Sequence, residues 1–175
     1  MANDCPDSVK AILAELDVPL ALIAERSLVF QPEAVDLVVA ETEATGRKHL
    51  LVRPAADAWQ AMQAAAAADG VPIRIVSAFR TVERQAQIVR AKLQSGLPLD
   101  AILRVSAPPG YSEHHSGRAV DLTTDGIAPL EEAFEGTPAF AWLAAKAHEF
   151  SYSLSFPTNN RWGYAYEPWH WCFEM

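Results

Sequence analysis

The chain has 175 residues, 50% of them hydrophobic, and a formal net charge of −8 at pH 7. Its length suits a single domain with a substantial core, and its acidity argues against nucleic acid or an anionic membrane as a partner. Two cysteines, Cys5 and Cys172, are too few for a disulfide framework, so we expect two free thiols.

The first 49 residues are expected to form a helical segment that packs on the rest of the domain. Apolar residues recur at helical spacing in residues 7–16, and a second helix is predicted at 32–42, before a turn at Gly46. No secretory leader is visible, and the apolar run at 18–24 is too short to span a bilayer. We therefore expect either a cytoplasmic protein or a cell-envelope protein whose export leader is not part of this sequence.

Residues 50–175 are expected to form the core of the domain from helices and largely antiparallel strands. The predicted strands cover residues 50–53, 71–78, 118–124, 152–156 and 163–173. The predicted helices cover residues 54–69, the stretch between Thr81 and Gly96, a single turn at 100–104, and residues 138–150. This order predicts the α+β class, with a central, mainly antiparallel sheet and helices packed against it.

A histidine and an aspartate near the middle of the chain have the spacing of a metal site. In the predicted strand, Asp121 and the small residue Ala119 share one face, which leaves room beside the carboxylate. Gly117 suits a turn that brings the loop with His114 back toward Asp121. His115 is a competing ligand, because two adjacent histidines do not easily face one ion.

A second stretch near the end of the chain supplies another histidine and a carboxylate. Glu167 and His170 lie three positions apart, and Pro168 between them excludes a helix interior. Two histidines and an aspartate are typical ligands of a catalytic zinc ion that keeps one position for water. Glu167 is then a candidate base for the proton of that water. Period-two spacing puts Cys172 on the same face as His170, so the alternative of a thiol beside the metal stays open.

Arg80 is the candidate group for stabilising negative charge that develops on a substrate. It follows the predicted strand at 71–78 and precedes a helix, a rigid support for a functional side chain. The alternative is a surface ion pair with an acid such as Glu83. Ser112 either donates a hydrogen bond to substrate or shapes its loop, and Trp169 is placed to wall a pocket for a small apolar group.

The motif Ser-x-His-x-x-Gly-x-Ala-x-Asp, followed by Glu-x-x-His, resembles that of the zinc D-alanyl-D-alanine carboxypeptidases of the VanY type. Its residues here are Ser112, His114, Gly117, Ala119, Asp121, Glu167 and His170, and the upstream segment with Arg80 and Gln85 is also similar. That family is related to the D-Ala-D-Ala dipeptidases, the L,D-carboxypeptidases and the hedgehog-type zinc fold. The register of the motif favours His114 over His115 as the ligand.

The resemblance implies a metallopeptidase that binds one zinc ion and releases the C-terminal D-amino acid of a peptidoglycan stem peptide. The implied roles are metal ligands for His114, Asp121 and His170, base for Glu167, transition-state arginine for Arg80, and substrate contact for Gln85. Two alternatives stay open. One is an L,D-carboxypeptidase or D-Ala-D-Ala dipeptidase with the same site, and the other is a catalytically silent zinc-binding module, against which the presence of Glu167 and Arg80 weighs.

Overall fold

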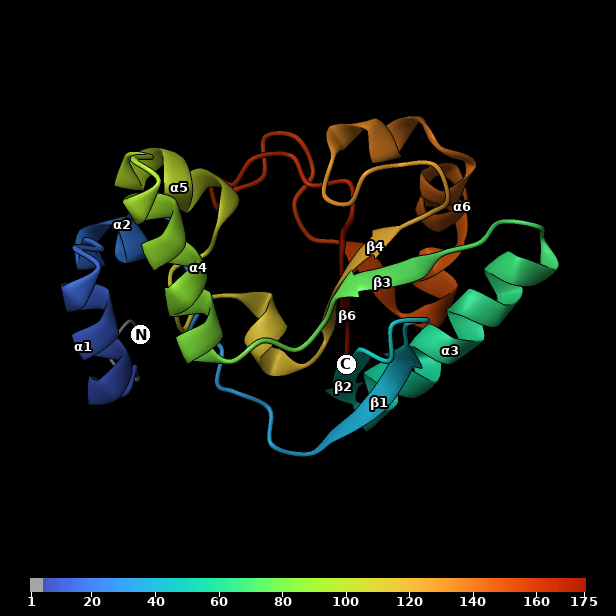
Figure 1. The fold of residues 1–175 in the computed structure, drawn as a ribbon, viewed down its shortest axis with the longest axis horizontal. Helices are drawn as coiled ribbons and strands as arrows, with labels where there is room; N and C mark the ends of the chain where they lie inside the picture. Colours follow the sequence, from blue (N-terminus) through green and yellow to red (C-terminus); the bar gives the residue numbers. More distant parts are fainter. Residues whose placement is uncertain (1–4) are drawn as a thin grey trace.

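The structure, a computed structural model, describes residues 5–175 as six α-helices and six β-strands, joined by loops and short 3-10 helices (Figure 1). The helices are α1 (Asp7–Glu15), α2 (Leu20–Glu25), α3 (Arg53–Ala68), α4 (Val82–Gln94), α5 (Leu99–Val105) and α6 (Pro138–Lys146). The strands are β1 (Leu37–Thr42), β2 (Lys48–Val52), β3 (Arg74–Ser77), β4 (Ala119–Thr123), β5 (Tyr152–Leu154) and β6 (His170–Phe173). The predicted α+β single domain is therefore confirmed.

A four-stranded antiparallel sheet in the order β3-β4-β6-β5 forms the centre of the fold, and β1 and β2 make a separate hairpin. The strand β4 is buried along its whole length because it lies between β3 and β6. In this register Asp121 of β4 lies opposite Ser77 of β3 on one side and opposite His170 of β6 on the other. Antiparallel pairing thus brings together residues that are far apart in the sequence.

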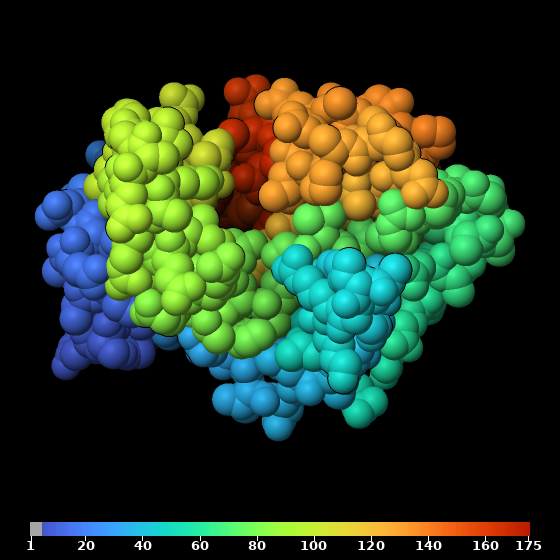
Figure 2. Space-filling model, viewed as in Figure 1, coloured from blue at the N-terminus to red at the C-terminus, as the bar shows by residue number. Residues whose placement is uncertain are grey.

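Two hydrophobic cores stabilise the domain. The larger core joins α3, α6 and the sheet, around fully buried residues such as Trp59 and Leu122. The smaller core joins α1, α2, α4 and α5, with Leu13, Ala86 and Ile102 at its centre. Figure 1 shows the corresponding division, with α1, α2, α4 and α5 on the left and α3 and α6 on the right. The surface is hollowed between these two halves (Figure 2).

Threonine side chains cap two of the helices. The Thr81 hydroxyl accepts a hydrogen bond from the Arg84 backbone N–H at 3.1 Å and begins α4, and Thr137 does the same for Phe140 at the start of α6. The helix predicted at 138–150 is shorter, because α6 ends at Lys146 and a 3-10 turn follows.

The helix predicted at 32–42 is wrong. Residues Leu37–Thr42 form β1, which pairs with β2 in an antiparallel hairpin around Gly46. The neighbouring β-branched residues Val38 and Val39 favour a strand, and the hairpin partner satisfies the backbone hydrogen bonds. The segment 1–49 therefore contains a strand as well as helices. The predicted last strand was also too long, since β6 begins only at His170.

Among residues 5–175, no helix combines the length and the hydrophobicity that crossing a membrane requires.

Candidate metal centre

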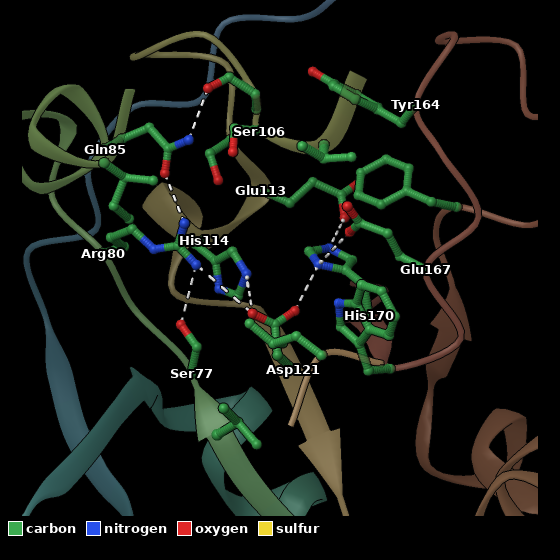
Figure 3. A pocket seen from close by; sticks show the side chains of 18 of the residues that line it. Ser77, Arg80, Gln85, Ser106, Glu113, His114, Asp121, Tyr164, Glu167 and His170 are labelled. Atoms are coloured by element: carbon green, nitrogen blue, oxygen red, sulfur yellow. Dashed lines mark hydrogen bonds and ion pairs between the residues drawn. The ribbon is translucent and has the colours of Figure 1, made fainter. Parts of the chain in front are cut away.

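Three side chains that commonly bind metal ions converge beside the sheet (Figure 3). His114 lies in the short 3-10 helix η1 (Glu113–Ser116), Asp121 in β4, and His170 at the start of β6. All three are buried, and one ligand atom of each lies within 4.8 Å of the others. The carboxylate lies between the rings, with Oδ2 3.1 Å from His114 Nε2 and Oδ1 3.0 Å from His170 Nδ1. Within the described part of the chain, this is the one such group found.

Gly117 explains how the loop with His114 reaches the sheet. It has φ +67°, a conformation that L side chains rarely adopt, and a Cβ added there would lie 2.9 Å from Leu37 Cδ2. Two backbone hydrogen bonds hold the loop, from Val52 N to Gly117 O at 2.9 Å and from Arg80 N to His114 O at 3.2 Å. The predicted turn at Gly117 is thus required both by conformation and by close packing.

The ring nitrogens that face away from Asp121 also have partners. His114 Nδ1 lies 2.7 Å from the Ala78 carbonyl oxygen, so this nitrogen carries the hydrogen and Nε2 is free to act as a ligand. His170 Nε2 lies 3.0 Å from Glu113 Oε2, and the Ser155 hydroxyl donates to the same oxygen at 2.6 Å. These contacts fix both rings with one nitrogen toward the common centre.

Glu113 was not predicted as a functional residue. Its side chain is 23% exposed, and burial raises its pKa, but the hydrogen bond and the charge of His170 outweigh burial and lower it. A carboxylate that accepts from the outer nitrogen of a histidine ligand is a common support in metal sites. The available signal was its place next to His114 inside the motif, but its partner is 57 positions away.

The three converging side chains form a strongly coupled group of charges. Burial raises the pKa of Asp121, but the contacts with His114 and His170 dominate and lower it. Burial lowers the pKa of His170, but its hydrogen bonds to Asp121 and Glu113 dominate and raise it to about 10. For His114, burial dominates and the pKa is lowered. The group therefore favours a positive charge near the carboxylates, whether it is a proton or a metal ion.

Glu167 lies at the edge of this group, with Oε2 3.9 Å from His170 Nδ1 and a side chain that is 14% exposed. It points toward the same centre as the three converging side chains (Figure 3). Burial raises its pKa to about 7, with a further contribution from the negative charge of Asp121. A carboxyl group with this pKa can both accept and release a proton near neutral pH.

Arg80 lies on the other side of Asp121, with Nη2 3.7 Å from Oδ2. Its guanidinium also donates to Ser77 Oγ at 3.1 Å and to Gln85 Oε1 at 2.7 Å. The alternative pairing with Glu83 is not formed, because that carboxylate contacts Arg90 at 2.9 Å. The amide nitrogen of Gln85 donates to Ala107 O at 2.7 Å, so both ends of this buried side chain already have protein partners.

A cavity of about 780 Å³ opens over this group, in the hollow between the two halves of the molecule. Ser112 and Trp169, the two predicted substrate contacts, line this cavity. His115 does not take part, because its Nδ1 lies 2.6 Å from Arg80 O and its Nε2 accepts from Gly110 N at 3.1 Å. Cys172 is not part of the converging group either.

Comparison with known proteins gives a consistent relationship. YodJ of Bacillus subtilis (strain 168) is 32% identical over 145 residues, which are 79% of this chain and 53% of YodJ. The chain thus spans about half the length of this relative. The LD-carboxypeptidase LdcB has a similar structure, with a TM-score of 0.72 and 30% identity over 81% of this chain and 69% of LdcB. A vancomycin-resistance D,D-pentapeptidase VanY, solved in complex with Zn(II), has a TM-score of 0.64 and 27% identity over 85% of this chain and 88% of its own.

The sequence profile of a peptidase family matches most of the chain. The profile is that of VanY, D-alanyl-D-alanine carboxypeptidase, and it covers residues 48–175, which include the converging side chains, Glu167 and Arg80. The resemblance that the motifs indicated is therefore confirmed. The chain belongs to the VanY family of D-alanyl-D-alanine carboxypeptidases.

Proposed function

We propose that this protein is a zinc-dependent carboxypeptidase that hydrolyses the bond before the C-terminal D-amino acid of peptidoglycan stem peptides. The observation that carries the proposal is the buried convergence of His114, Asp121 and His170, with Glu167 beside them in an open cavity. Family membership supports the reaction, and the VanY structure with Zn(II) supports the metal.

The residues fit a zinc ion by their chemistry. Two imidazole nitrogens and one carboxylate are a donor set of catalytic zinc, which leaves a position for water. The outer nitrogens of both rings are occupied by Ala78 and Glu113, so His114 Nε2 and His170 Nδ1 would hold the ion together with Asp121. When bound, zinc acts as a Lewis acid and lowers the pKa of water to about 7.

The chain's own groups then have separate tasks. Glu167, with a pKa of about 7, accepts the proton of the attacking water and returns it to the leaving amine. Arg80 places its guanidinium beside Asp121, where it stabilises negative charge on the substrate oxygen. Because both ends of Gln85 are occupied by protein, we propose that it acts by holding Arg80 rather than by contacting substrate as the resemblance implied.

Two residues of the cavity wall remain proposed substrate contacts. Trp169 offers an apolar surface to a small side chain such as the methyl group of D-alanine, and Ser112 offers a hydroxyl near the metal ligands. Discrimination between terminal residues of similar size is worth only about 1–3 kcal/mol, so closely related peptides can share this site.

An L,D-carboxypeptidase is the second candidate, because LdcB has a higher TM-score than the VanY structure described above and matches 81% of this chain. The two activities differ in the peptide that is cut. A D,D-enzyme releases D-alanine from a pentapeptide ending in D-Ala-D-Ala, whereas an L,D-enzyme releases it from a tetrapeptide. A dipeptidase would act on neither stem peptide, because its substrate is the free dipeptide D-Ala-D-Ala.

The test is D-alanine release from tri-, tetra- and pentapeptide stems, with added zinc and with a chelator. We expect release from the pentapeptide, loss of activity with chelator and recovery with zinc. The Glu167→Gln variant is expected to bind zinc without turnover. Zinc binding by the wild-type protein without release from any stem peptide would refute the proposed carboxypeptidase, and inactivity on free D-Ala-D-Ala as well would support the silent module.

A further inference from the structure

One face of α4 forms a wall of the proposed substrate cavity along the length of the helix. Gln85 in the first turn is held against Arg80, close to the candidate metal ligands, and Lys92 lies in the last turn. The α4 residues that line the cavity are Arg84, Gln85, Ile88 and Lys92. Residues of the segment that leads to β6, including Glu167 and Trp169, line the same cavity. Figure 2 shows the hollow between the half that contains α4 and the half that contains α6.

Lys92 differs from Arg80 and Arg47, which face carboxylates in the same cavity, and from Arg84, which is exposed and donates to Gln87 Oε1 at 3.2 Å. Its ammonium group donates to Ser106 Oγ at 2.7 Å and has no carboxylate within 4.0 Å among residues 5–175, although the side chain is partly buried. Arg80 faces Asp121 at 3.7 Å, and Arg47 faces Glu43 at 3.8 Å. Burial of a cation without an anionic partner is unfavourable, so such a group in a cavity is prepared for an anion.

The position of Lys92 also connects it to the reaction centre. Burial lowers its pKa, and the negative charge of Glu167 acts in the opposite direction. Its hydroxyl partner Ser106 is followed by Ala107, whose carbonyl accepts from Gln85, the side chain that holds Arg80. The ammonium therefore belongs to the same cavity as the groups proposed to act on the scissile bond, at the other end of α4 from Gln85.

A carboxypeptidase substrate brings one anion to every reaction, the free α-carboxylate of its last residue. Arg80 is poorly available for this second anion, because its guanidinium is already assigned to the substrate oxygen and also contacts Asp121, Ser77 and Gln85. We propose that Lys92, together with the Ser106 hydroxyl, receives the terminal carboxylate and restricts the enzyme to peptides with a free C-terminus. This proposal rests on the carboxypeptidase function proposed above.

The test compares two peptides that differ only in this anion, diacetyl-L-Lys-D-Ala-D-Ala and its C-terminal amide. The first peptide carries the terminal carboxylate as its single charge. For Lys92→Met we expect kcat/KM on the acid to fall about 10- to 100-fold, the strength of a charge-assisted hydrogen bond, with little change on the amide. Lys92→Arg should restore part of the preference for the acid.

Two further variants separate binding from folding and from net charge. Ser106→Ala removes one of the two proposed donors but leaves the ammonium, so it should lower the acid-over-amide preference less than Lys92→Met does. Lys48→Met loses the same charge at an exposed position with no side-chain hydrogen bond or ion pair within the described residues, and it should behave as wild type. If Lys92→Met and Ser106→Ala lower the rates on both peptides equally, Lys92 is only a brace between α4 and α5, and the proposal is wrong.

The remaining outcomes also have definite meanings. If Lys92→Met leaves hydrolysis of the short acid unchanged but weakens hydrolysis of a full stem peptide, Lys92 binds an upstream carboxylate and the proposal is overturned. If the wild-type protein hydrolyses neither peptide, the expected D,D-carboxypeptidase activity fails, and calorimetric titration of the same pair still tests Lys92. Equal affinity of the wild-type protein for the acid and the amide would then refute its role as the carboxylate receptor.

Discussion

Replacement of Glu113 by alanine tests whether the support behind His170 contributes to metal binding. The change removes the carboxylate that accepts from His170 Nε2 at 3.0 Å and from the Ser155 hydroxyl at 2.6 Å. Hydrogen bonds to a charged group contribute about 1.5–3 kcal/mol, and each 1.4 kcal/mol is a factor of ten in affinity. We therefore expect Glu113→Ala to weaken zinc binding about 10- to 100-fold, in agreement with the usual effect of such supports.

The assay is competition for zinc against a chromophoric chelator at neutral pH, with the fold of each variant checked by its unfolding temperature. Glu113→Gln keeps the shape but accepts as a neutral amide, so its loss should be smaller, about half as large in free energy. Glu132→Gln is the matched control, because Glu132 is an exposed carboxylate of the same cavity. Wild-type zinc affinity in a folded Glu113→Ala protein would refute the reasoning.

Three further changes have defined outcomes. Glu167→Gln is expected to lower kcat for D-alanine release about 10²- to 10⁴-fold while zinc affinity, measured by the same competition, changes much less; a comparable loss of zinc would make Glu167 a ligand instead. In chelator-treated protein, the unfolding temperature should fall as the pH rises from 6.5 toward 10. The folded state holds the His170 proton more tightly than the unfolded chain does, because the folded pKa is about 10. This stabilisation is lost as the pH rises through that pKa. His170→Gln should remove that part of the slope, and an unchanged slope would contradict the assignment. Gly117→Ala should cost at least about 1–2 kcal/mol in unfolding free energy, because φ is +67° and the new methyl group meets Leu37; urea denaturation with wild-type stability would show that the loop adapts.

The elements of residues 54–150 could be predicted because their signals are local. The side chains of Thr81 and Thr137 each cap a helix that follows directly, and Gly96 follows the end of α4 with φ +87°. Residues 32–42 gave no such signal. Their strand is stabilised by pairing with β2, and a preference that depends on a partner strand is weak in the sequence of one strand alone.

The three side chains that converge in the candidate metal centre could also be predicted from the sequence. His114 and Asp121 share one short motif with a glycine, so their convergence follows from local geometry, and His170 is marked by the proline-interrupted stretch with Glu167. Glu113 and Lys92 could not be recognised in this way. The functional meaning of Glu113 depends on His170 in another strand, and that of Lys92 on its burial against Ser106, so both become visible only in three dimensions.

Each of the two hydrophobic cores stabilises a different part of the proposed site. Asp121 and His170 stand on strands that belong to the core with α3 and α6, whereas Gln85 and Lys92 stand on the helix whose apolar residues belong to the core with α1 and α2. Partial loosening of the smaller core on heating would therefore displace the groups that orient a peptide while the ion remains bound. Thermal inactivation should then precede metal release, a sequence of events that a site built on one core would not produce.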